Sequence, residues 1–564
     1  MSSKLLLLGC AAFAALSFSA HQSAAEVKPR RHAVKHHDEA NLVAMDALNQ
    51  KVQALEENLA AEGQARVALQ GQVQAAQAQA QAAQAAAEAA HQQLAEQIQT
   101  IPGEVKADVA AEKPKDGKAH YKGVTLTLGG FAAAESVYRS RNEEADIGSS
   151  FAKIPFANNP LAHTSELRAT ARQSRLSLLA EGDINPNTKA AFYTEFDFLA
   201  GPQTGNSVES NSFSPRVRNL YGTLDVGNVE FLGGQSWSLT TMNTKGITPR
   251  NELIPTTIDG QYVVGFTWAR QPQLRVTDSF ADKQIWAALS LENPQTTFAS
   301  PATGTTGASV SGLTVTTAGT PTSQFDTANS FSINHVPDVI GKLAIEPEIM
   351  GSRPVHAEVY GLYRAYADRV NVTGANVLGL PVGARNDNTD GGGVGGGVIW
   401  TVVPKLLDLQ ASGLIGQGIG RYGSAQLPDT VVGVNGALKP IPEGMLLVGA
   451  TLHATSALDV YAYYGEDRDK SVQTSIGAGH YGYGSPFATL AACSVEGGTC
   501  SPDIRTETQF TGGLWDKVYQ GGFGYVRVGL QYSYTELTAF SGATGGAPKT
   551  NENMIFTSFR YYPF

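Results

Sequence analysis

The chain has 564 residues, a formal net charge of −10 and 16% charged residues. This acidic balance argues against a nucleic-acid partner, and a mean hydropathy of −0.15 excludes a bundle of apolar membrane helices. The length is sufficient for several domains or for one large β-barrel.

The first 25 residues are predicted to be a secretory signal peptide. Lys4 precedes an apolar run from Leu5 to Ala20, and Ser23-Ala-Ala25 supplies the small residues of a cleavage site. The stretch Leu7-Leu-Gly-Cys10 has the form of a lipoprotein cleavage box. The apolar run continues well past Cys10, however, and this favours the secretory signal over lipidation.

After a basic flank over residues 26–37, the composition of residues 38–101 shifts to Ala, Gln and Glu, without Pro. A heptad counted from Met45 predicts a periplasmic coiled-coil stem, interrupted at Arg66, Glu62 and Gln97. Its apolar core positions are Met45, Leu48, Val52, Leu55, Leu59, Leu69, Val73, Leu94 and Ile101. Such a stripe requires partner helices, and we expect a homotrimer; a helix-prone Ala/Gln linker is the alternative.

Pro102-Gly103 ends the helical pattern, and residues 102–122 are predicted to be a linker. From residue 123 to residue 564 the pattern is one of strands, tyrosines, glycines and loops. Sixteen strands are predicted, with an uncertainty of about two. They lie near residues 124–138, 165–182, 188–199, 214–226, 228–236, 261–277, 284–292, 338–347, 355–366, 392–403, 406–416, 444–455, 457–466, 505–515, 522–537 and 553–564.

The connections between these strands alternate in length. Short turns such as Asn185-Pro-Asn187 and Val403-Pro-Lys405 alternate with long polar loops such as 293–337 and 467–504. Outer-membrane barrels have this one-sided asymmetry, with short periplasmic turns and longer outer loops. The predicted fold is therefore an all-β transmembrane barrel of about sixteen antiparallel strands, preceded by an α-helical coiled coil.

Period-two alternation supports the barrel, because charged side chains in mid-strand, opposite an aromatic band, are costly unless they face water. In 522–537 the apolar face consists of Val526, Val528, Leu530, Tyr532 and Tyr534. In 188–199 the polar face consists of Tyr193, Glu195 and Asp197. In 261–277 the predicted apolar face consists of Tyr262, Val264, Phe266 and Trp268, opposite Thr267, Gln271, Gln273 and Arg275. Soluble β-sandwiches are the alternative, but they do not usually place so many charges in mid-strand against aromatics.

Several short motifs follow one another along the mature chain. They are Gly129-Gly-Phe131, Gln173-Ser-Arg-Leu176, Pro215-Arg-Val-Arg-Asn-Leu-Tyr221, Gly233-Gly-Gln-Ser-Trp237, Arg270-Gln-Pro-Gln-Leu-Arg275, Val336-Pro-Asp338 and the aromatic carboxy-terminus at Phe564. Their order, together with the stem, resembles the DcaP-like porins of Gram-negative bacteria, trimeric barrels with an amino-terminal coiled coil. The resemblance implies uptake of small anionic solutes, especially dicarboxylates.

Selectivity requires a constriction, and the loop over residues 237–260 has the length and position to fold into the lumen. Its candidate constriction residues are Lys245, Arg250, Glu252 and Asp259. Rings of Arg or Lys favour anions, and alternation together with the resemblance gives the lumen candidates Arg175, Arg216, Arg218, Arg275, Arg364 and Arg527. Arg216 and Arg218 are less secure, because Leu220 and Leu224 share their parity. Alternatively, the arginines pair with Glu195, Asp197 and Glu358 and only neutralise the wall.

Two further expectations concern chemistry. Cys493 and Cys500, separated by six residues in a loop-like stretch, are predicted to form a disulfide; metal ligation is the alternative. His356 and His453 stand alone on predicted strands, and the glycine run 391–397 lacks the strand-to-helix context of a phosphate loop. We therefore expect no enzyme activity, no cofactor and no metal.

The sequence as a whole predicts an outer-membrane porin, with outer-membrane lipid, lipopolysaccharide and small anionic solutes as partners. One alternative is a structural tether, in which the stem links a plugged barrel to the periplasmic matrix. A trimeric adhesin, in which several chains share one small barrel, is disfavoured because the predicted strands here fill most of a single chain and the stem precedes them.

Overall fold

The structure is a computed structural model that describes residues 118–200, 213–299, 312–317, 331–349, 353–374, 376, 378–476 and 479–564. The predicted signal peptide, basic flank and coiled-coil stem lie outside the described residues, as does the linker up to residue 117. In the described part of the chain, no helix has the length and apolar character needed to span a membrane.

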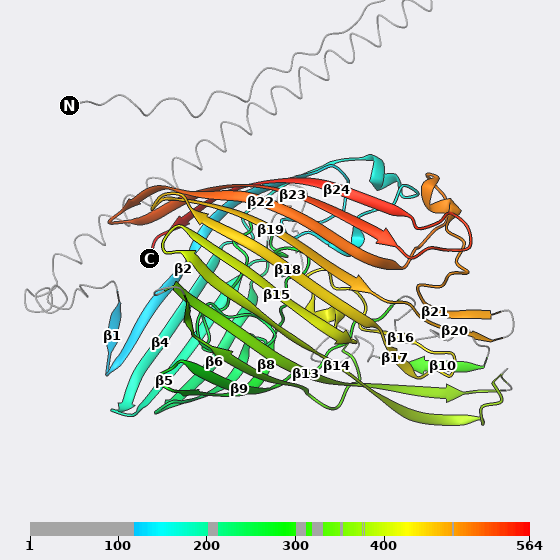
Figure 1. Cartoon of the computed structure of the whole chain (residues 1–564), viewed down its shortest axis with the longest axis horizontal. Helices are drawn as coiled ribbons and strands as arrows, with labels where there is room; N and C mark the ends of the chain where they lie inside the picture. Colours follow the sequence, from blue (N-terminus) through cyan, green and yellow to red (C-terminus); the bar gives the residue numbers. More distant parts are fainter. Residues whose placement is uncertain are drawn as a thin grey trace, which may run out of the picture. The chain divides into compact units, whose positions relative to one another are not determined.

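The described residues form a closed antiparallel barrel in which sixteen strands follow one another in chain order (Figure 1). The strands are β2 (Val124–Arg139), β4 (Arg175–Asn185), β5 (Thr188–Asp197), β6 (Arg216–Val226), β7 (Val229–Trp237), β8 (Arg270–Phe280), β9 (Ile285–Glu292), β11 (Asp338–Ile345), β13 (Arg353–Val372), β14 (Gly383–Val403), β15 (Leu407–Gln417), β18 (Pro442–His453), β19 (Leu458–Asp469), β22 (Ile504–Gly521), β23 (Gly524–Ala539) and β24 (Lys549–Tyr562). Closure comes from β24, which pairs with β2 from Ala132↔Tyr561 to Arg139↔Met554. The predicted strand number is confirmed.

Shorter elements lie at the ends of the barrel or inside it. They are the strands β1 (Ala119–Tyr121), β3 (Glu166–Thr170), β10 (Leu313–Thr316) and β12 (Glu348–Ile349), the hairpins β16 (Thr430–Val432) with β17 (Leu438–Pro440) and β20 (Val472–Ile476) with β21 (Gly479–Tyr483), and the 3-10 turns η1 (Phe151–Lys153), η2 (Pro160–His163), η3 (Gly420–Tyr422) and η4 (Ala491–Ser494). Because β3 and β4 both pair with β2, they occupy one strand position in the barrel.

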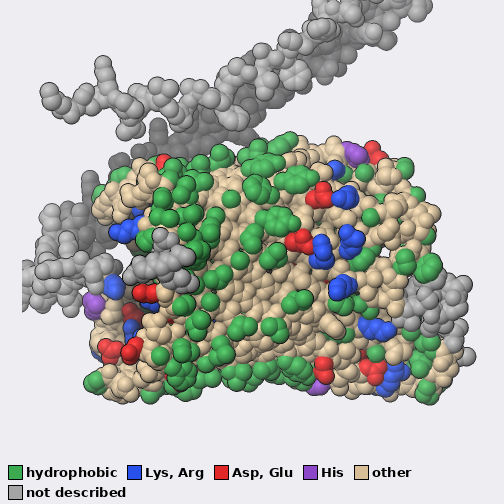
Figure 2. Space-filling view, in the orientation of Figure 1, with side chains coloured by type: hydrophobic (Ala, Val, Ile, Leu, Met, Phe, Trp, Pro, Cys, Tyr) green, Lys and Arg blue, Asp and Glu red, His purple; other side chains and the backbone are tan. Residues whose placement is uncertain are grey.

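The outer wall is apolar and the inner wall polar, as the alternation predicts. On β23, Leu530 and Tyr532 are 49% and 42% exposed on the outside, whereas Gln531 and Ser533 are buried inside. Figure 2 shows hydrophobic side chains spread over the outer wall of the barrel. Lipid solvates such a surface, whereas the polar lumen of a large barrel holds water.

A β-bulge explains how Arg218 faces inward although it shares its parity with Leu220. On β6, Val217 pairs with Phe196 and Asn219 pairs with Glu195, so Arg218 is an extra residue on its strand. A bulge of this kind shifts the alternation by one position. Arg218 is therefore buried inside the barrel, and Leu220 is exposed on the outer wall.

The two ends of the barrel differ as predicted. At one end the strands are joined by short turns, such as residues 186–187, 227–228 and 522–523. At the other end longer segments join them, among them residues 140–165, 238–269, 418–441 and 470–503. Figure 1 shows the hairpins β16–β17 and β20–β21 together at this second end.

The strand predicted for residues 261–277 is wrong in its first half, because β8 begins only at Arg270. Tyr262 and Gly265 have φ angles of 74° and 86°, which turn the backbone out of the extended conformation. Tyr262, Val264 and Phe266 are consequently buried inside the barrel rather than exposed on its outer wall. Apolar alternation alone does not distinguish an outer wall from a loop packed inside.

The segment between β21 and β22 is tied to a neighbouring loop. Cys493 and Cys500 form a disulfide with 5.0 Å between their Cα atoms. The side chain of Asn158 donates hydrogen bonds to the carbonyl oxygens of Gly498 (3.0 Å) and Cys500 (3.1 Å). The ring of residues closed by this disulfide therefore holds the loop over residues 140–165 at the rim of the barrel.

Candidate functional site

Residues 238–269, hereafter the inward loop, cross the inside of the barrel. After β7 the loop first follows the wall made by β9, β11 and β13. The backbone N–H of Leu239 donates to Glu292 (3.0 Å), Lys342 Nζ donates to the carbonyl of Thr241 (2.8 Å), and the N–H of Asn243 donates to Glu358 (3.1 Å). Charged side chains that point inward therefore hold the first part of the loop.

The second part of the inward loop is bound to strands on the opposite side of the barrel. The indole of Trp515 on β22 donates to the carbonyl of Thr256 (2.7 Å), and the N–H of Ile258 donates to Gln531 on β23 (2.5 Å). Further along, the N–H of Val264 donates to Gln509 on β22 (3.0 Å). The loop thus spans the lumen from one wall to the other.

The four predicted constriction residues lie on this loop in different environments. Lys245 and Arg250 are exposed, and the Arg250 guanidinium lies 5.6 Å from the ring centre of Tyr193 on β5. Glu252 is half-buried, whereas Asp259 is only 2% exposed. The two basic residues are therefore the ones of this set that face solvent.

Asp259 connects the inward loop to the loop over residues 140–165. Its Oδ1 accepts hydrogen bonds from the N–H groups of Ser149 (3.0 Å) and Gln261 (2.8 Å), while no donor in the described residues reaches its Oδ2. Burial raises the pKa of Asp259 to about 6, although the charge of Arg139 opposes this shift.

We expect Asp259→Asn to stabilise the barrel at neutral pH. Because an unfolded aspartate has a pKa of about 3.9, the native protein binds more protons than the unfolded chain between about pH 4 and pH 6. The contribution of Asp259 to stability is therefore complete below about pH 4 and is lost as pH rises through about 6. The variant should gain on the order of 2 kcal/mol at pH 7.5 and nothing at pH 4. Unfolding temperatures at both pH values check this; an equal gain at both would contradict it.

Five arginines from four strands gather near Tyr262 of the inward loop. This arginine cluster consists of Arg175, Arg216, Arg218, Arg270 and Arg560. Its carboxylate partners are Asp197, which Arg216 (2.7 Å) and Arg218 (2.9 Å) share, Glu195, which Arg218 also contacts, and Glu135, which Arg560 contacts (2.8 Å). The Glu195 and Asp197 pairs are those that the alternative interpretation of the sequence anticipated.

Aromatic rings line the arginine cluster. The guanidinium of Arg270 lies 5.0 Å from the ring centre of Trp237 and 5.3 Å from that of Trp268. The phenol of Tyr262 accepts a hydrogen bond from Arg218 (3.3 Å). Burial raises the pKa of Tyr262, but the nearby charges of Arg218, Arg270 and Arg175 outweigh burial and lower it below the usual value. The field at the inward loop is therefore positive.

Two members of the cluster have no carboxylate oxygen within 4 Å among the described residues, although the charge of Glu195 acts on Arg175 and that of Asp197 on Arg270 from further away. Arg175 lies against the ring of Phe131 (5.4 Å), and Arg270 lies against the two tryptophans. The Nε atoms of both are buried without a hydrogen-bond acceptor in the described part of the chain. Five guanidinium groups thus face three carboxylates, which leaves a local excess of positive charge.

The remaining lumen candidates lie elsewhere, so the six predicted arginines do not form one ring. Arg275 on β8 is buried near the Ser236 hydroxyl (3.3 Å), and Arg527 pairs with Asp459 beside a short turn (3.2 Å). Glu358 pairs with Lys342 (2.7 Å) rather than with an arginine. In the described residues, no group of three or more His, Cys, Asp or Glu side chains is arranged to hold a metal ion.

Sequence reasoning missed Arg270, Arg560 and Lys342. Arg270 shares its parity with Trp268, so the strand predicted over 261–277 placed it on the lipid face. Arg560 shares its parity with Tyr562 and Phe564 at the aromatic end of the chain. Residues of the inward loop with positive φ angles, such as Tyr262 and Gly265, interrupt the strand alternation before Arg270. No pattern in the sequence marks this interruption, so it does not reveal that Arg270 faces inward.

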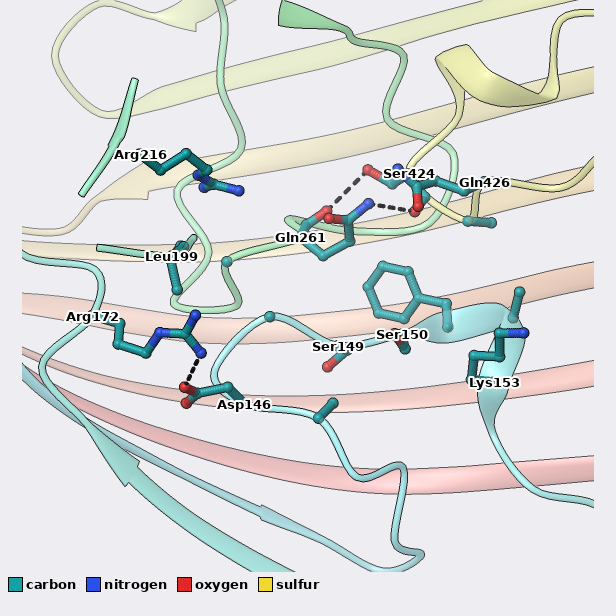
Figure 3. Close-up of a pocket in the computed structure, with 16 residues that line it drawn as sticks. Asp146, Ser149, Ser150, Lys153, Arg172, Leu199, Arg216, Gln261, Ser424 and Gln426 are labelled. Carbon is teal, nitrogen blue, oxygen red and sulfur yellow. Dashed lines mark hydrogen bonds and ion pairs between the residues drawn. The ribbon is translucent and has the colours of Figure 1, made fainter. Parts of the chain in front are cut away.

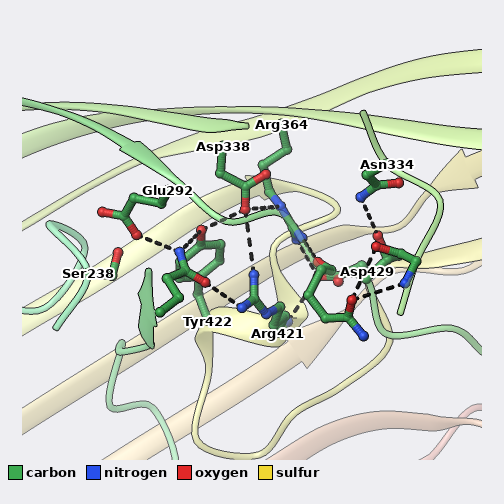
Figure 4. Close-up of polar contacts among 12 residues, drawn as sticks. Ser238, Glu292, Asn334, Asp338, Arg364, Arg421, Tyr422 and Asp429 are labelled. Atoms are coloured by element: carbon green, nitrogen blue, oxygen red, sulfur yellow. Dashed lines mark hydrogen bonds and ion pairs between the residues drawn. The ribbon is translucent and has the colours of Figure 1, made fainter. Parts of the chain in front are cut away.

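Arg364 belongs to a buried ionic network rather than to the arginine cluster (Figure 4). Its guanidinium pairs with Asp338 (3.2 Å) and Asp429 (2.7 Å), and all three side chains are fully buried. Tyr422 donates to Asp338 (2.8 Å), and Arg421 lies 3.7 Å from the same carboxylate. The network fixes residues 418–441 against the inner wall of β11 and β13.

We expect Arg364→Met to destabilise the barrel by about 3–5 kcal/mol, because it leaves two buried carboxylates without their main cation. The half-buried pair of Arg385 with Asp387 (3.0 Å) remains in contact with water and offers a matched control, since its removal should cost less than about 1 kcal/mol. Heat-dependent mobility of the folded barrel on gels, or denaturant unfolding, measures both. Equal losses in the two variants would contradict the role assigned to the network.

A cavity of about 400 Å³ adjoins the arginine cluster (Figure 3). It lies between residues 145–153, the inward loop at Gly260 and Gln261, and residues 424–426, and Arg172 and Arg216 line it. Arg172 pairs with Asp146 (2.6 Å), and Gln261 donates to the carbonyl of Ser424 (2.8 Å). Arg216 thus borders both the cavity and the cluster.

No protein-family model and no curated protein sequence matches the chain. Among solved structures, the outer membrane channel DcaP of Acinetobacter baumannii is similar, with a TM-score of 0.51 and 16% identity over 78% of this chain and 99% of that chain. An anion-selective porin from Comamonas acidovorans (TM-score 0.40, 14% identity, 78% and 99% covered) and Salmonella typhi OmpF in complex with daunomycin (TM-score 0.41, 10% identity, 79% and 100% covered) are more distant. The resemblance to the DcaP-like porins holds in the fold: the described residues form a closed antiparallel barrel like that of the DcaP channel.

Proposed function

We propose that the protein is an outer-membrane porin that passes small hydrophilic solutes and prefers anions, dicarboxylates among them. The observation that carries the proposal is the arginine cluster beside the inward loop, where Arg175 and Arg270 have no carboxylate at ion-pair distance in the described residues. Positive side chains at a constriction raise the local concentration of anions and repel cations. We further propose a homotrimer with a cleaved signal peptide and a periplasmic coiled-coil stem, which the heptads support.

Two unpaired guanidinium groups favour a solute with two carboxylates. A guanidinium presents a planar fork of N–H donors that matches a carboxylate. Arg175 and Arg270 lie on either side of Arg218, which its own carboxylates neutralise. A dicarboxylate can therefore contact both free guanidinium groups in turn along the inward loop.

The reversal potential of the purified protein in a planar bilayer under a KCl gradient tests the anion preference. We expect anion-selective current in steps of three, and stronger block of this current by succinate than by butyrate at equal concentration. Cation selectivity would overturn the anion preference, and equal block would overturn the dicarboxylate preference. A folded protein without conductance would favour the structural tether, for which the fold gives no support.

A further inference from the structure

His356 on β13 lies between two carboxylates, and each of them also binds the inward loop. Its Nδ1 lies 2.8 Å from Oε1 of Glu346, in the turn after β11, and its Nε2 lies 2.9 Å from Oε2 of Glu358 on the same strand. Glu346 accepts a hydrogen bond from the backbone N–H of Gly246, and Glu358 accepts one from that of Asn243 (3.1 Å). The imidazole therefore connects the two side chains that hold this part of the loop.

The two contacts of His356 indicate its charge. A neutral imidazole has one N–H donor, whereas an imidazolium has two. Both ring nitrogens face carboxylate oxygens, so only the imidazolium donates a hydrogen bond at both positions. The side chains of His356 and Glu358 are 1% and 0% exposed, so bulk water does not replace a missing donor. The geometry therefore corresponds to a histidine that is a buried cation.

The imidazolium completes a balanced set of charges, hereafter the histidine clamp, which consists of His356, Glu346, Glu358 and Lys342. Lys342 Nζ donates to Glu358 (2.7 Å) and to the carbonyl of Thr241 in the inward loop (2.8 Å). Two cations thus face two carboxylates, and no side-chain N or O atom of these four described residues is buried without a partner. Loss of one proton from His356 leaves a net negative charge and one carboxylate without its donor, which is costly in a buried network.

No further cation in the described part of the chain contacts either carboxylate of the histidine clamp. The residue opposite His356 on β14 is Ile399, which carries no charge. Lys245 of the inward loop is exposed to solvent. Two charges of opposite sign act on Lys342 from further away, Arg275 on β8 and Glu252 on the inward loop. The charge of the clamp therefore changes with the protonation of His356.

We propose that His356 positions the first part of the inward loop and makes the width of the channel depend on pH. At low pH the imidazolium holds Glu346 and Glu358, and with them the loop, against the wall of β11 and β13. As pH rises, His356 gives its proton to water in the lumen, one carboxylate loses its donor, and residues 241–253 leave the wall. The second part of the loop stays bound to β22 and β23, so this release widens the constriction without removing it. This inference rests on the channel proposal but not on the preference for anions.

Single-channel conductance in a planar bilayer, measured from about pH 5 to about pH 9, tests the pH dependence, because the pKa of a free histidine is about 6.5. We expect the conductance of the natural protein to rise about twofold over this range in a transition that involves one proton, since part of the constriction leaves a wide barrel. H356Q has no titrating group at this position and leaves one carboxylate without a donor. This variant should therefore have the higher conductance at every pH.

E346Q should have the opposite effect. The amide at position 346 accepts the N–H of Gly246 through its oxygen and donates to Nδ1 of a neutral His356, whose Nε2–H donates to Glu358. The histidine clamp is then complete without the imidazolium. The conductance of this variant should therefore stay at the lower value at every pH.

H453Q is the matched control, because His453 also lies between two carboxylates. They are Asp459 (2.7 Å) and Asp408 (3.2 Å), and in the described residues none of the three side chains contacts the inward loop. Both histidines that stand alone in the sequence are thus paired in the structure, but only His356 is connected to the loop. H453Q should keep the pH transition.

Hydrogen exchange of the backbone amides of residues 241–253, corrected for the intrinsic effect of pH, reports on the loop independently of conductance. Protection should fall as pH rises in the natural protein, be low throughout in H356Q and stay high throughout in E346Q. If these exchange results hold but the protein does not conduct, the positioning role of His356 stands and the channel proposal fails.

Three outcomes would overturn the proposal: a pH transition that persists in H356Q, changes in the same direction in H356Q and E346Q, or loss of the transition in H453Q. The first would place the titrating group elsewhere, the second would mean general damage to the loop, and the third would assign the transition to His453. Heat-dependent mobility on gels shows whether each variant is folded. If H356Q does not fold, E346Q alone decides, because a transition that persists in E346Q contradicts the proposal.

Discussion

Replacing Gly465 with valine should open the channel and raise its single-channel conductance severalfold. Gly465 faces inward on β19, where the backbone of the inward loop lies directly against the wall. A Cβ atom built at Gly465 would overlap the carbonyl oxygen of Val264. On the loop side, Gly265 has a φ of 86°, and a Cβ there would overlap the carbonyl oxygen of Leu446. Two glycines thus allow two backbones to meet without side chains between them.

The expected change follows from what the valine displaces. Neither contact atom belongs to a flexible side chain, so the loop has to leave the wall and lose the bond between Val264 and Gln509 (3.0 Å). Such overpacking costs about 1–3 kcal/mol. We expect the variant to fold, because the other contacts of the barrel remain. A sixteen-stranded barrel without its constriction is a wide aqueous channel. Conductance and the size of the largest permeating sugar should therefore rise together.

Gly512→Ala on the neighbouring strand β22 is the matched control, because a Cβ there would meet nothing closer than 3.8 Å. The control should conduct as the natural protein does. If Gly465→Val folds and conducts normally, the inward loop does not narrow the channel at β19. If Gly465→Val fails to fold, Gly465→Ala offers a smaller displacement with the same expected direction.

The barrel could be predicted from sequence because its constraints are local and repeated. Each strand alternates between lipid and lumen, as Leu530 and Gln531 do on β23, and the short turns fall at one end only. The strand number follows from these two signals. Strand ends were less accurate on β13 and β14, which extend past their predicted limits because their outer halves continue to pair with one another, and β13 also pairs with β10 there.

The site was predicted only in part, because it depends on where the alternation fails. Arg218 is turned inward by a bulge, and Arg270 follows a loop whose apolar residues pack inside the barrel rather than against lipid. The bulge and the loop each change which residues of a strand face the lumen. Neither changes the amino-acid composition, so the sequence pattern does not show them. Pairing is non-local as well: Arg560 meets Glu135 across the closure of the barrel, 425 positions away in the sequence.

Substituting both Arg175 and Arg270 by glutamine should remove most of the anion selectivity. The two guanidinium groups provide the positive excess of the arginine cluster, since the other three have carboxylate partners. A unit charge 4 Å from an ion contributes about 1 kcal/mol in bulk water and more beside a protein wall. Loss of both should lower the ratio of chloride to potassium permeability by about tenfold or more. Glutamine removes the charge and keeps a polar, hydrogen-bonding side chain.

Measuring the reversal potential at several salt concentrations distinguishes the effect of a charge in the lumen from that of a distant charge. Screening lengths fall from about 30 Å at 0.01 M to about 3 Å at 1 M, so the difference between variant and natural protein should be large in dilute KCl and small in concentrated KCl. The variant R468Q/R505Q removes the same charge from the outer wall and should leave the reversal potential unchanged. If the two double variants shift the reversal potential equally, the selectivity comes from the net charge of the protein. A shift confined to R175Q/R270Q would instead place it at the arginine cluster, where the inward loop meets the wall.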